Sequence, residues 1–300
     1  MKSKNSIRES ASRKIFLICN GVFFLIITFV CFYPLWYVFV QSLSNGNQAV
    51  NALAWPVGFT LNNYVELLKM DDIFRAFLIS VARTLIGTVT HVICCMYAGY
   101  LFTKEDMPLR KLCYRIMVIT MYVSGGLIPT FLTIKAYGLM NNFWVYILPS
   151  LISAYDVILI KTFVEQLPAE LEESARIDGA NTMRVFLSII LPLSLPIVAT
   201  ISIYASNSQW NSWFDCQLYT VNTESLYPLQ YLLYNYLNRS EELLKQLREA
   251  DASDALLDKY MTPRGIKMTV TMISTIPILC VYPFMQRYLV KGIMIGAVKG

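Results

Sequence analysis

Long blocks of apolar residues without a single charge limit what this chain can fold into. No Asp, Glu, Lys or Arg occurs from Ile15 to Tyr64, and none occurs from Val185 to Phe214. Charged residues make up only 15% of the chain, against about 25% in soluble domains. Because about 20 apolar residues suffice to cross a bilayer as a helix, these blocks predict an all-α integral membrane protein.

We expect six transmembrane helices, each at a segment that combines sufficient length with few charges. They are Ile15–Val40, Thr84–Thr103, Ile116–Ile134, Asn142–Ile160, Val185–Asn207 and Met268–Gln286. Basic residues precede the first span, follow the second and recur in the tail, which places the N- and C-termini in the cytoplasm. The first span is too long for a cleaved signal peptide and is interpreted as an anchor.

Ionisable residues within the predicted spans are few. His91 is the only histidine, and we expect it to bond a neighbouring helix rather than to take part in transport. Arg83 and Asp156 lie near predicted span ends and are expected to extend toward water. The seven cysteines follow no metal or disulfide spacing. The sequence therefore predicts no catalytic and no metal-binding residue, and it disfavours a proton- or sodium-coupled carrier.

The third predicted span contains residues that disturb a helix. Gly125 and Gly126 are followed by Pro129, so this span is expected to be the least regular. Two interpretations stay open for these three residues, namely close packing through small side chains and a flexible point that gates a pathway.

A short polar segment between the fourth and fifth spans should fold as a helix–turn–helix on the cytoplasmic side. Pro168 suits the first turn of a helix, and Gly179 can adopt a positive φ and close that helix. Asn181 or Thr182 can cap a second helix, Met183–Ile190, which we expect to run directly into the fifth span. A structured polar knob on so apolar a chain predicts a docking site for a soluble partner.

A DNA-binding helix–turn–helix unit can also place an alanine four residues before a turn glycine. Here, however, the segment from Lys161 to Arg184 contains five carboxylates and only three basic residues, whereas phosphate binding requires an excess of positive charge. We therefore expect no nucleic acid partner.

The spacing of the knob resembles the EAA loop of ABC importer permeases. Glu173-Ser174-Ala175 is followed after three residues by Gly179, and after nine more by Ile189-x-Leu191-Pro192. The string Leu171–Ala180 resembles the carbohydrate branch of that family, and Gln286–Gly300 resembles the tail of its maltose-G-type subunit. Within the branch, the chain resembles the LplC/YtcP-like permeases for complex oligosaccharides. Ser174 departs from the usual alanine but is small enough to preserve the docking face.

The resemblance implies a type I ABC importer permease fold and a carbohydrate of oligosaccharide size as the transported solute. It divides the chain into an N-terminal part at 1–73, a MetI-like core with five spans at 74–290 and a cytoplasmic tail at 291–300. It also implies a bacterial cytoplasmic membrane location and several partners. These are a second homologous permease, two cytoplasmic ATPase subunits and an extracytoplasmic sugar-binding protein. The residues expected to couple to an ATPase are Glu173, Ser174, Ala175, Gly179, Ile189, Leu191 and Pro192.

The chain itself lacks the glycine-rich phosphate loop of an ATPase. We therefore expect it to be a transport subunit rather than an enzyme, to bind no cofactor, and to leave ATP and Mg²⁺ to its partners. Sugar passage needs aromatic faces and amide groups, which gather at the outer end of the fifth span. The candidates are Tyr204, Asn207, Gln209, Trp210, Asn211 and Trp213, although interfacial anchoring would explain the aromatic residues equally.

Two alternatives remain. The first is a permease of the same family for a solute that is not a sugar. The second is a membrane channel or scaffold outside the ABC family, which would require a polar stripe along the spans or a large soluble domain.

Overall fold

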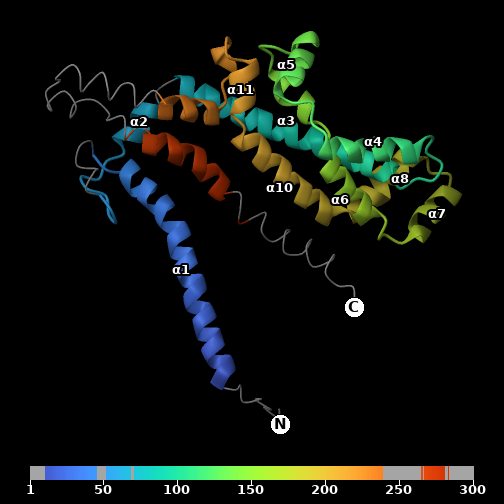
Figure 1. Cartoon of the computed structure of the whole chain (residues 1–300), viewed down its shortest axis with the longest axis horizontal. Helices are drawn as coiled ribbons and strands as arrows, with labels where there is room; N and C mark the ends of the chain where they lie inside the picture. The colour runs from blue at the N-terminus through green and yellow to red at the C-terminus, as the bar shows by residue number, and fades with distance from the viewer. Residues whose placement is uncertain are drawn as a thin grey trace. The chain divides into compact units, whose positions relative to one another are not determined.

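The computed structural model describes residues 11–45, 52–68, 71–238, 265, 267–280 and 283, and every regular element among them is helical (Figure 1). The surface helix expected within 240–261 and the tail at 291–300 lie outside the described residues. Contacts divide the chain into two units, residues 1–67 with 240–272 and residues 68–239 with 273–300. Each unit is described by itself.

The first unit contains α1 (Ala11–Ser42), whose apolar side chains are exposed along most of its length. A helix that is apolar on all sides suits a membrane span. The loop after it folds back on the end of α1, because Gln41 Nε2 donates to the carbonyl of Ala52 at 2.9 Å. The short helix α2 (Asn62–Leu68) is tied to the same end, since Asn63 Nδ2 donates to the carbonyl of Ser42 at 3.1 Å.

The second unit is built around α3 (Asp71–Leu101), which packs along α10 (Leu195–Asn211) and α6 (Ala154–Val164). This helix is longer than the predicted span Thr84–Thr103 and begins at Asp71. Asp71 and Asp72 lie in its first turn, where carboxylates are favoured by the helix dipole. The core includes Val92, Cys95, Met96, Tyr100, Val157, Ile160, Val185, Phe186, Ile190 and Ile201.

The third predicted span is not one helix. It consists of α4 (Arg110–Tyr122) and α5 (Leu127–Ala136). Gly126 separates them with a φ of 83°, a conformation that a residue with a side chain rarely adopts. The expected irregularity at Gly125-Gly126 is therefore present, and it amounts to a complete break.

The fourth predicted span is also interrupted. Two short 3₁₀ helices, η2 (Phe143–Tyr146) and η3 (Leu148–Ser150), precede α6 at an angle of 48°. Ser153 caps α6 by accepting a hydrogen bond from the backbone N–H of Asp156 at 3.4 Å.

The fifth predicted span bends by 84° between Thr182–Leu193 and Leu195–Asn211. The first part comprises α8 (Thr182–Val185), the π-helical segment η4 (Phe186–Ile190) and α9 (Leu191–Leu193). Pro196 has no N–H to offer the carbonyl four residues earlier, so the helix cannot continue unbroken. The prediction that the second helix of the knob runs directly into the fifth span is therefore wrong.

The remaining described elements are α11 (Phe214–Tyr219), η5 (Glu224–Leu226), a helix at 229–238 and a helix at Lys267–Cys280. Within the described part of the chain, α1 and α3 are long and apolar enough to cross a membrane, and up to four spans result if each bent pair counts as one. The last helix covers the first part of the predicted sixth span.

Candidate functional site

The predicted knob is present and consists of α7 (Ala169–Ile177), a tight turn and α8. Pro168 stands directly before α7, and Gly179 ends it with a φ of 79°. The N–H of Gly179 donates to the carbonyl of Arg176 at 3.0 Å, and that of Ala180 donates to Ala175 at 2.9 Å. This pair of bonds is the Schellman arrangement that satisfies carbonyls at a helix end, and the predicted positive φ is confirmed.

The second half of the knob begins as the sequence indicates. The Asn181 side chain accepts a hydrogen bond from the N–H of Arg184 at 2.9 Å, so Asn181 and not Thr182 caps α8. Ile189 and Leu191 then pack against the core of the second unit, while Pro192 stays exposed.

Helix α7 presents two different faces. Ala175 is half-buried and packs on the core, whereas Glu173 and Ser174 are exposed. Leu171 is 42% exposed and Ile177 is 86% exposed. The outward face thus combines apolar and acidic groups without a partner from the described chain that would bury them.

One contact of the knob was missed by the sequence reasoning. Glu172 forms an ion pair with Lys104, just beyond the end of α3, and accepts a hydrogen bond from the hydroxyl of Tyr100 at 3.2 Å. Arg176 adds a second ion pair to Glu172 at 3.0 Å. Tyr100 is fully buried and its ring stacks on Phe186, with 5.7 Å between the centroids. We call Tyr100, Lys104, Glu172 and Arg176 the clamp.

The clamp changes the electrostatics of Glu172. Burial is the largest single influence and by itself would raise the pKa of this carboxyl. The hydrogen bond and charge of Lys104, the hydrogen bond of Tyr100 and the charge of Arg176 together outweigh burial, so the pKa of Glu172 lies below its ordinary value. The i,i+4 spacing of Glu172 and Arg176 was a visible signal of pairing, whereas nothing in the sequence linked Glu172 to Lys104.

The six candidate pathway residues do not share one environment. Tyr204, Asn207 and Asn211 are exposed, while Gln209 and Trp210 are buried. The indole of Trp210 donates to the carbonyl of Ser274 at 3.0 Å. Trp213 is half-buried and stacks on Tyr234 with 4.1 Å between the ring centroids.

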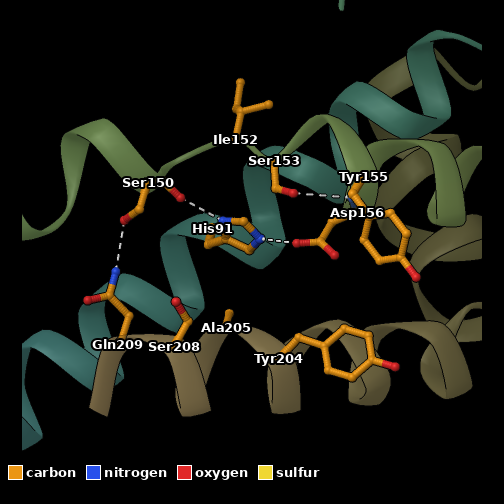
Figure 2. Close-up of a pocket in the computed structure, with 10 residues that line it drawn as sticks. All are labelled: His91, Ser150, Ile152, Ser153, Tyr155, Asp156, Tyr204, Ala205, Ser208 and Gln209. Carbon is orange, nitrogen blue, oxygen red and sulfur yellow. Dashed lines mark hydrogen bonds and ion pairs between the residues drawn. The ribbon is translucent and has the colours of Figure 1, made fainter. Parts of the chain in front are cut away.

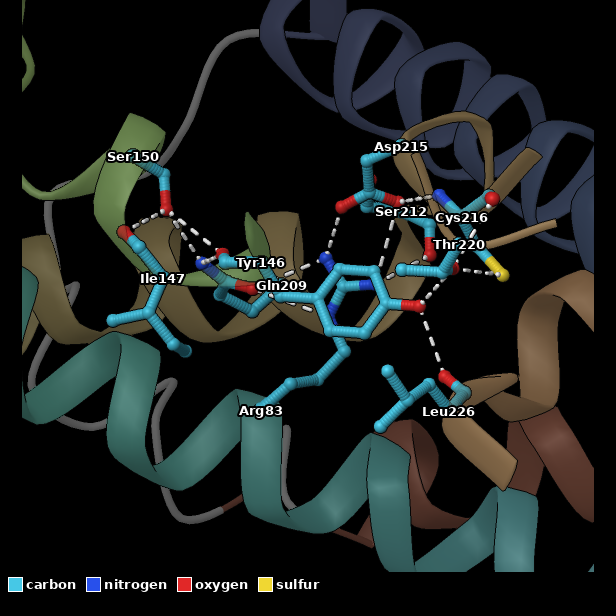
Figure 3. A network of polar contacts seen from close by, with 10 residues as sticks. All are labelled: Arg83, Tyr146, Ile147, Ser150, Gln209, Ser212, Asp215, Cys216, Thr220 and Leu226. Atoms are coloured by element: carbon cyan, nitrogen blue, oxygen red, sulfur yellow. Dashed lines mark hydrogen bonds and ion pairs between the residues drawn. The ribbon is translucent and has the colours of Figure 1, made fainter. Parts of the chain in front are cut away.

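Gln209 belongs to a buried network centred on Arg83 (Figure 3). The guanidinium of Arg83 donates to Gln209 Oε1 at 3.2 Å and pairs with Asp215 Oδ2 at 2.5 Å. It also lies over the ring of Tyr146, 4.3 Å from the centroid. Arg83 is only 1% exposed, so the prediction that it extends toward water is wrong. Its charge is instead matched inside the helix bundle.

The network continues toward His91. Gln209 Nε2 donates to the hydroxyl of Ser150 at 2.8 Å. The carbonyl of Ser150 lies 2.7 Å from His91 Nδ1, and His91 Nε2 lies 2.9 Å from Asp156 Oδ2 (Figure 2). The expected bond from His91 to a neighbouring helix is confirmed. Asp156 is buried in this pair, so the expectation that it extends toward water is also wrong.

The candidate gating residues lie at the break between α4 and α5. Gly125 and Pro129 line a cavity of about 660 Å³ together with residues of η3 and the segment after α5. A side chain at Gly126 would meet no atom within 4 Å, so backbone conformation and not space requires glycine there. The gating role itself stays a prediction.

Comparisons with known proteins identify related transport proteins. The polygalacturonan/rhamnogalacturonan transport system permease protein YtcP of Bacillus subtilis is 35% identical, over 93% of this chain and 96% of its own length. Protein LplC of the same organism is 33% identical over 100% of both chains. A solved bacterial ABC transporter involved in the import of the acidic polysaccharide alginate contains a chain that is 28% identical. The TM-score is 0.83, with 93% of this chain and 98% of that chain covered.

A described family also matches more than half of the chain. Residues 91–295 match the binding-protein-dependent transport system inner membrane components, and they include the knob, the clamp residues and the Gln209 end of the network. The chain has the type I ABC permease fold, and it belongs to this family of inner membrane transport components.

Proposed function

We propose that this chain is the transmembrane permease subunit of an ABC importer for a carbohydrate, of oligosaccharide size. The transport names of the relatives and of the structural neighbour support a sugar as the solute. The subunit would form half of the translocation pathway beside a second permease, and an external binding protein would deliver the sugar. Six spans with both termini in the cytoplasm remain the topology that the basic residues favour.

The single observation that carries the coupling role is the exposed outer face of α7. Ile177 is 86% exposed on a helix whose other face packs on the bundle. Leu171 of the same helix is also exposed, and several apolar side chains exposed on a rigid polar knob suit a soluble partner. We propose that an ATPase subunit docks here, that ATP and Mg²⁺ bind to the two ATPase subunits, and that this chain holds no cofactor.

The clamp offers a route from that docking site into the bundle. Glu172 ties α7 to the end of α3, and α8 leads through η4 to the bend before α10. A displacement of α7 would therefore act on α3 and α10 together. Since α3 and α10 pack along each other, the pair could respond as one body, as a two-state switch requires.

The test is co-purification and uptake with the full complex. The chain is produced with a second permease, an ATPase and a binding protein, and ATP-dependent oligosaccharide uptake is measured in vesicles. Ile177→Glu should reduce ATPase co-purification about tenfold or more, as loss of an interface anchor does, while Ile177→Leu should retain it. Unchanged co-purification of the Glu variant would overturn the docking site. Uptake of a non-sugar solute alone would overturn the carbohydrate assignment.

A further inference from the structure

A cavity of about 310 Å³ that contains several polar groups lies beside His91, between α6 and α10 (Figure 2). Its size falls at the lower end of the range for small-molecule sites, about 300–1,000 Å³. Such a volume suits one ring of a ligand rather than several. The buried His91–Asp156 pair is part of its lining, and ionisable groups within a membrane domain are the first candidates for a functional site.

The hydrogen-bonding groups of the cavity are mostly acceptors or hydroxyls. Asp156 uses Oδ2 for His91, and no other described residue donates to its carboxylate. Oδ1 is therefore available to accept a hydrogen bond, and the hydroxyl of Ser208 lies on the opposite wall. A ligand that carries several hydroxyl groups matches these positions, because a hydroxyl can donate to the carboxylate and accept from serine.

Two aromatic rings from different helices stand at the same cavity. Tyr155 of α6 is 52% exposed and Tyr204 of α10 is 45% exposed. Figure 2 shows the Asp156 carboxylate beside the Tyr155 ring, with Tyr204 on the facing helix. An aromatic face next to hydroxyl-binding groups suits a sugar ring, whose C–H face is apolar and whose edge is polar.

The charges of the cavity disfavour an acidic ligand. Its ten described lining residues include neither lysine nor arginine. Any positive charge on His91 is already matched by Asp156 at 2.9 Å. The nearby Arg83 is held by Asp215 and by Gln209. A ligand carboxylate would therefore approach the Asp156 carboxylate without a cation to pair with, which is unfavourable in a site of low polarity.

We propose that this cavity binds one neutral, hydroxyl-rich sugar ring and discriminates against a ring that carries a carboxylate. Asp156 accepts a sugar hydroxyl, Tyr155 and Tyr204 cover the ring faces, and His91 positions the carboxylate. The inference rests on the proposed function but goes beyond it, because it assigns the subsite and its selectivity.

The test uses the full-length chain in lipid nanodiscs and two matched probes. Galactobiose and digalacturonate have the same ring stereochemistry and differ at C6, which is a hydroxymethyl group in one and a carboxylate in the other. Binding is measured by saturation-transfer NMR and calorimetry. We expect galactobiose to bind about tenfold or more tightly than digalacturonate, the ratio that a difference of about 1.4 kcal/mol produces. Equal affinities, or tighter binding of digalacturonate, would overturn the selectivity.

Two variants locate the binding. Tyr204→Ala removes an exposed ring and should weaken galactobiose binding about tenfold, whereas Tyr204→Phe should bind as the parent does. Asp156→Asn keeps the size of the side chain and should bring the two affinities together, because the repelling charge is gone. If Tyr204→Ala and Asp156→Asn both bind the two probes as the parent does, the site is elsewhere.

A third measurement separates this inference from the proposed function. ATP-dependent uptake is followed in the assembled importer with the same variants. Oligosaccharide uptake that is unaffected by Tyr204→Ala and Asp156→Asn overturns the subsite and leaves the proposed function standing. Absence of uptake of any oligosaccharide by the parent complex overturns the proposed function.

Discussion

Gly179 is the residue of the knob whose identity is most tightly constrained by the backbone. Its φ of 79° is a left-handed conformation, and a side chain there would meet no atom within 4 Å. Only the backbone conformation therefore selects glycine. The left-handed conformation costs an L-residue with a side chain about 1–2 kcal/mol, and the cost is greatest for a β-branched residue.

Gly179→Val should consequently distort the turn between α7 and α8. We expect loss of ATPase association or of uptake, measured by co-purification and by transport in vesicles. Gly179→Asn is the matched control, because asparagine tolerates the left-handed region and should retain most activity. Normal uptake by a normally assembled Val variant would show that the turn is not needed in this form.

Glu172 is the residue of the clamp whose charge can be titrated. Its pKa is lowered in the folded chain, so its ionised form is favoured by folding. The stabilisation is fully present above the unfolded pKa, near 4.5, and is lost as the pH falls through the lower folded value. At neutral pH, Glu172→Gln should lower the free energy of unfolding by about 1.5–3 kcal/mol, as expected for loss of a hydrogen bond to a charged group.

The measurement is the thermal unfolding midpoint of both chains in nanodiscs from pH 7 down to pH 3. The difference between parent and Glu172→Gln should shrink once the pH falls below 4.5. Glu173→Gln, on the exposed face of the same helix, should have little effect at any pH. A difference that is independent of pH would mean that shape and not charge explains the role of Glu172.

At the scale of elements, the approach of α3 to α6 depends on Gly99. A Cβ atom at Gly99 would lie 2.6 Å from Ile160 Cγ2 and 3.2 Å from the carbonyl oxygen of Val157. Ile160 Cγ2 is attached directly to the Cβ of its residue, and the Val157 oxygen belongs to the backbone. Neither atom can move away unless the backbone of α6 moves. The small residue thus sets the distance between the two helices.

Gly99→Ala should therefore destabilise the chain by about 1–3 kcal/mol, the usual cost of overpacking. Gly21→Ala on α1 is the control, because a Cβ there meets nothing within 4 Å and alanine favours a helix by up to about 1 kcal/mol. Unfolding midpoints of the two variants should move in opposite directions. A Gly99→Ala variant as stable as the parent would contradict the close packing of α3 and α6.

The bends between elements show where local sequence signals are insufficient. The turn at Gly179 and the cap at Asn181 could be predicted, because their partners lie within a few residues. The prolines near the bend indicated a disturbance but not an angle of 84°. That angle depends on how Val185, Phe186 and Ile190 pack against α3 and α6, which a local pattern does not contain.

For the molecule as a whole, apolar blocks and one spaced motif were enough to predict a helical membrane protein and its family. The buried polar contacts could not be predicted from the sequence. Arg83 and Asp215 are 132 positions apart and His91 and Asp156 are 65 apart, so no spacing rule connects them. The positions of Arg83 and Asp156 near predicted span ends suggested solvent exposure, whereas the bundle brings Arg83 to Asp215 and Asp156 to His91. Long-range pairing was the information that the sequence reasoning lacked.

The Arg83 network ties together elements from most of the second unit. Arg83 of α3 contacts Gln209 of α10, Asp215 of α11 and the ring of Tyr146 in η2. Arg83→Met would leave the carboxylate of Asp215 and the amide oxygen of Gln209 without this donor. Removing one partner of a buried ion pair costs about 3–5 kcal/mol, and we expect a loss of stability of this order.

A double-mutant cycle separates this network from simple packing. Asp215→Asn should lower the free energy of unfolding less in the Arg83→Met background than in the parent chain. The difference, which is the coupling energy between Arg83 and Asp215, should be about 0.5–3 kcal/mol. Arg75→Met is the control, because Arg75 pairs with Asp72 at the surface, where both side chains are more than 40% exposed, and such pairs contribute about 1 kcal/mol or less. Unfolding midpoints of all variants are compared in nanodiscs. If Arg83→Met lowers the unfolding midpoint no more than Arg75→Met does, then helix packing alone, without the buried charges, holds α3, α10 and α11 together.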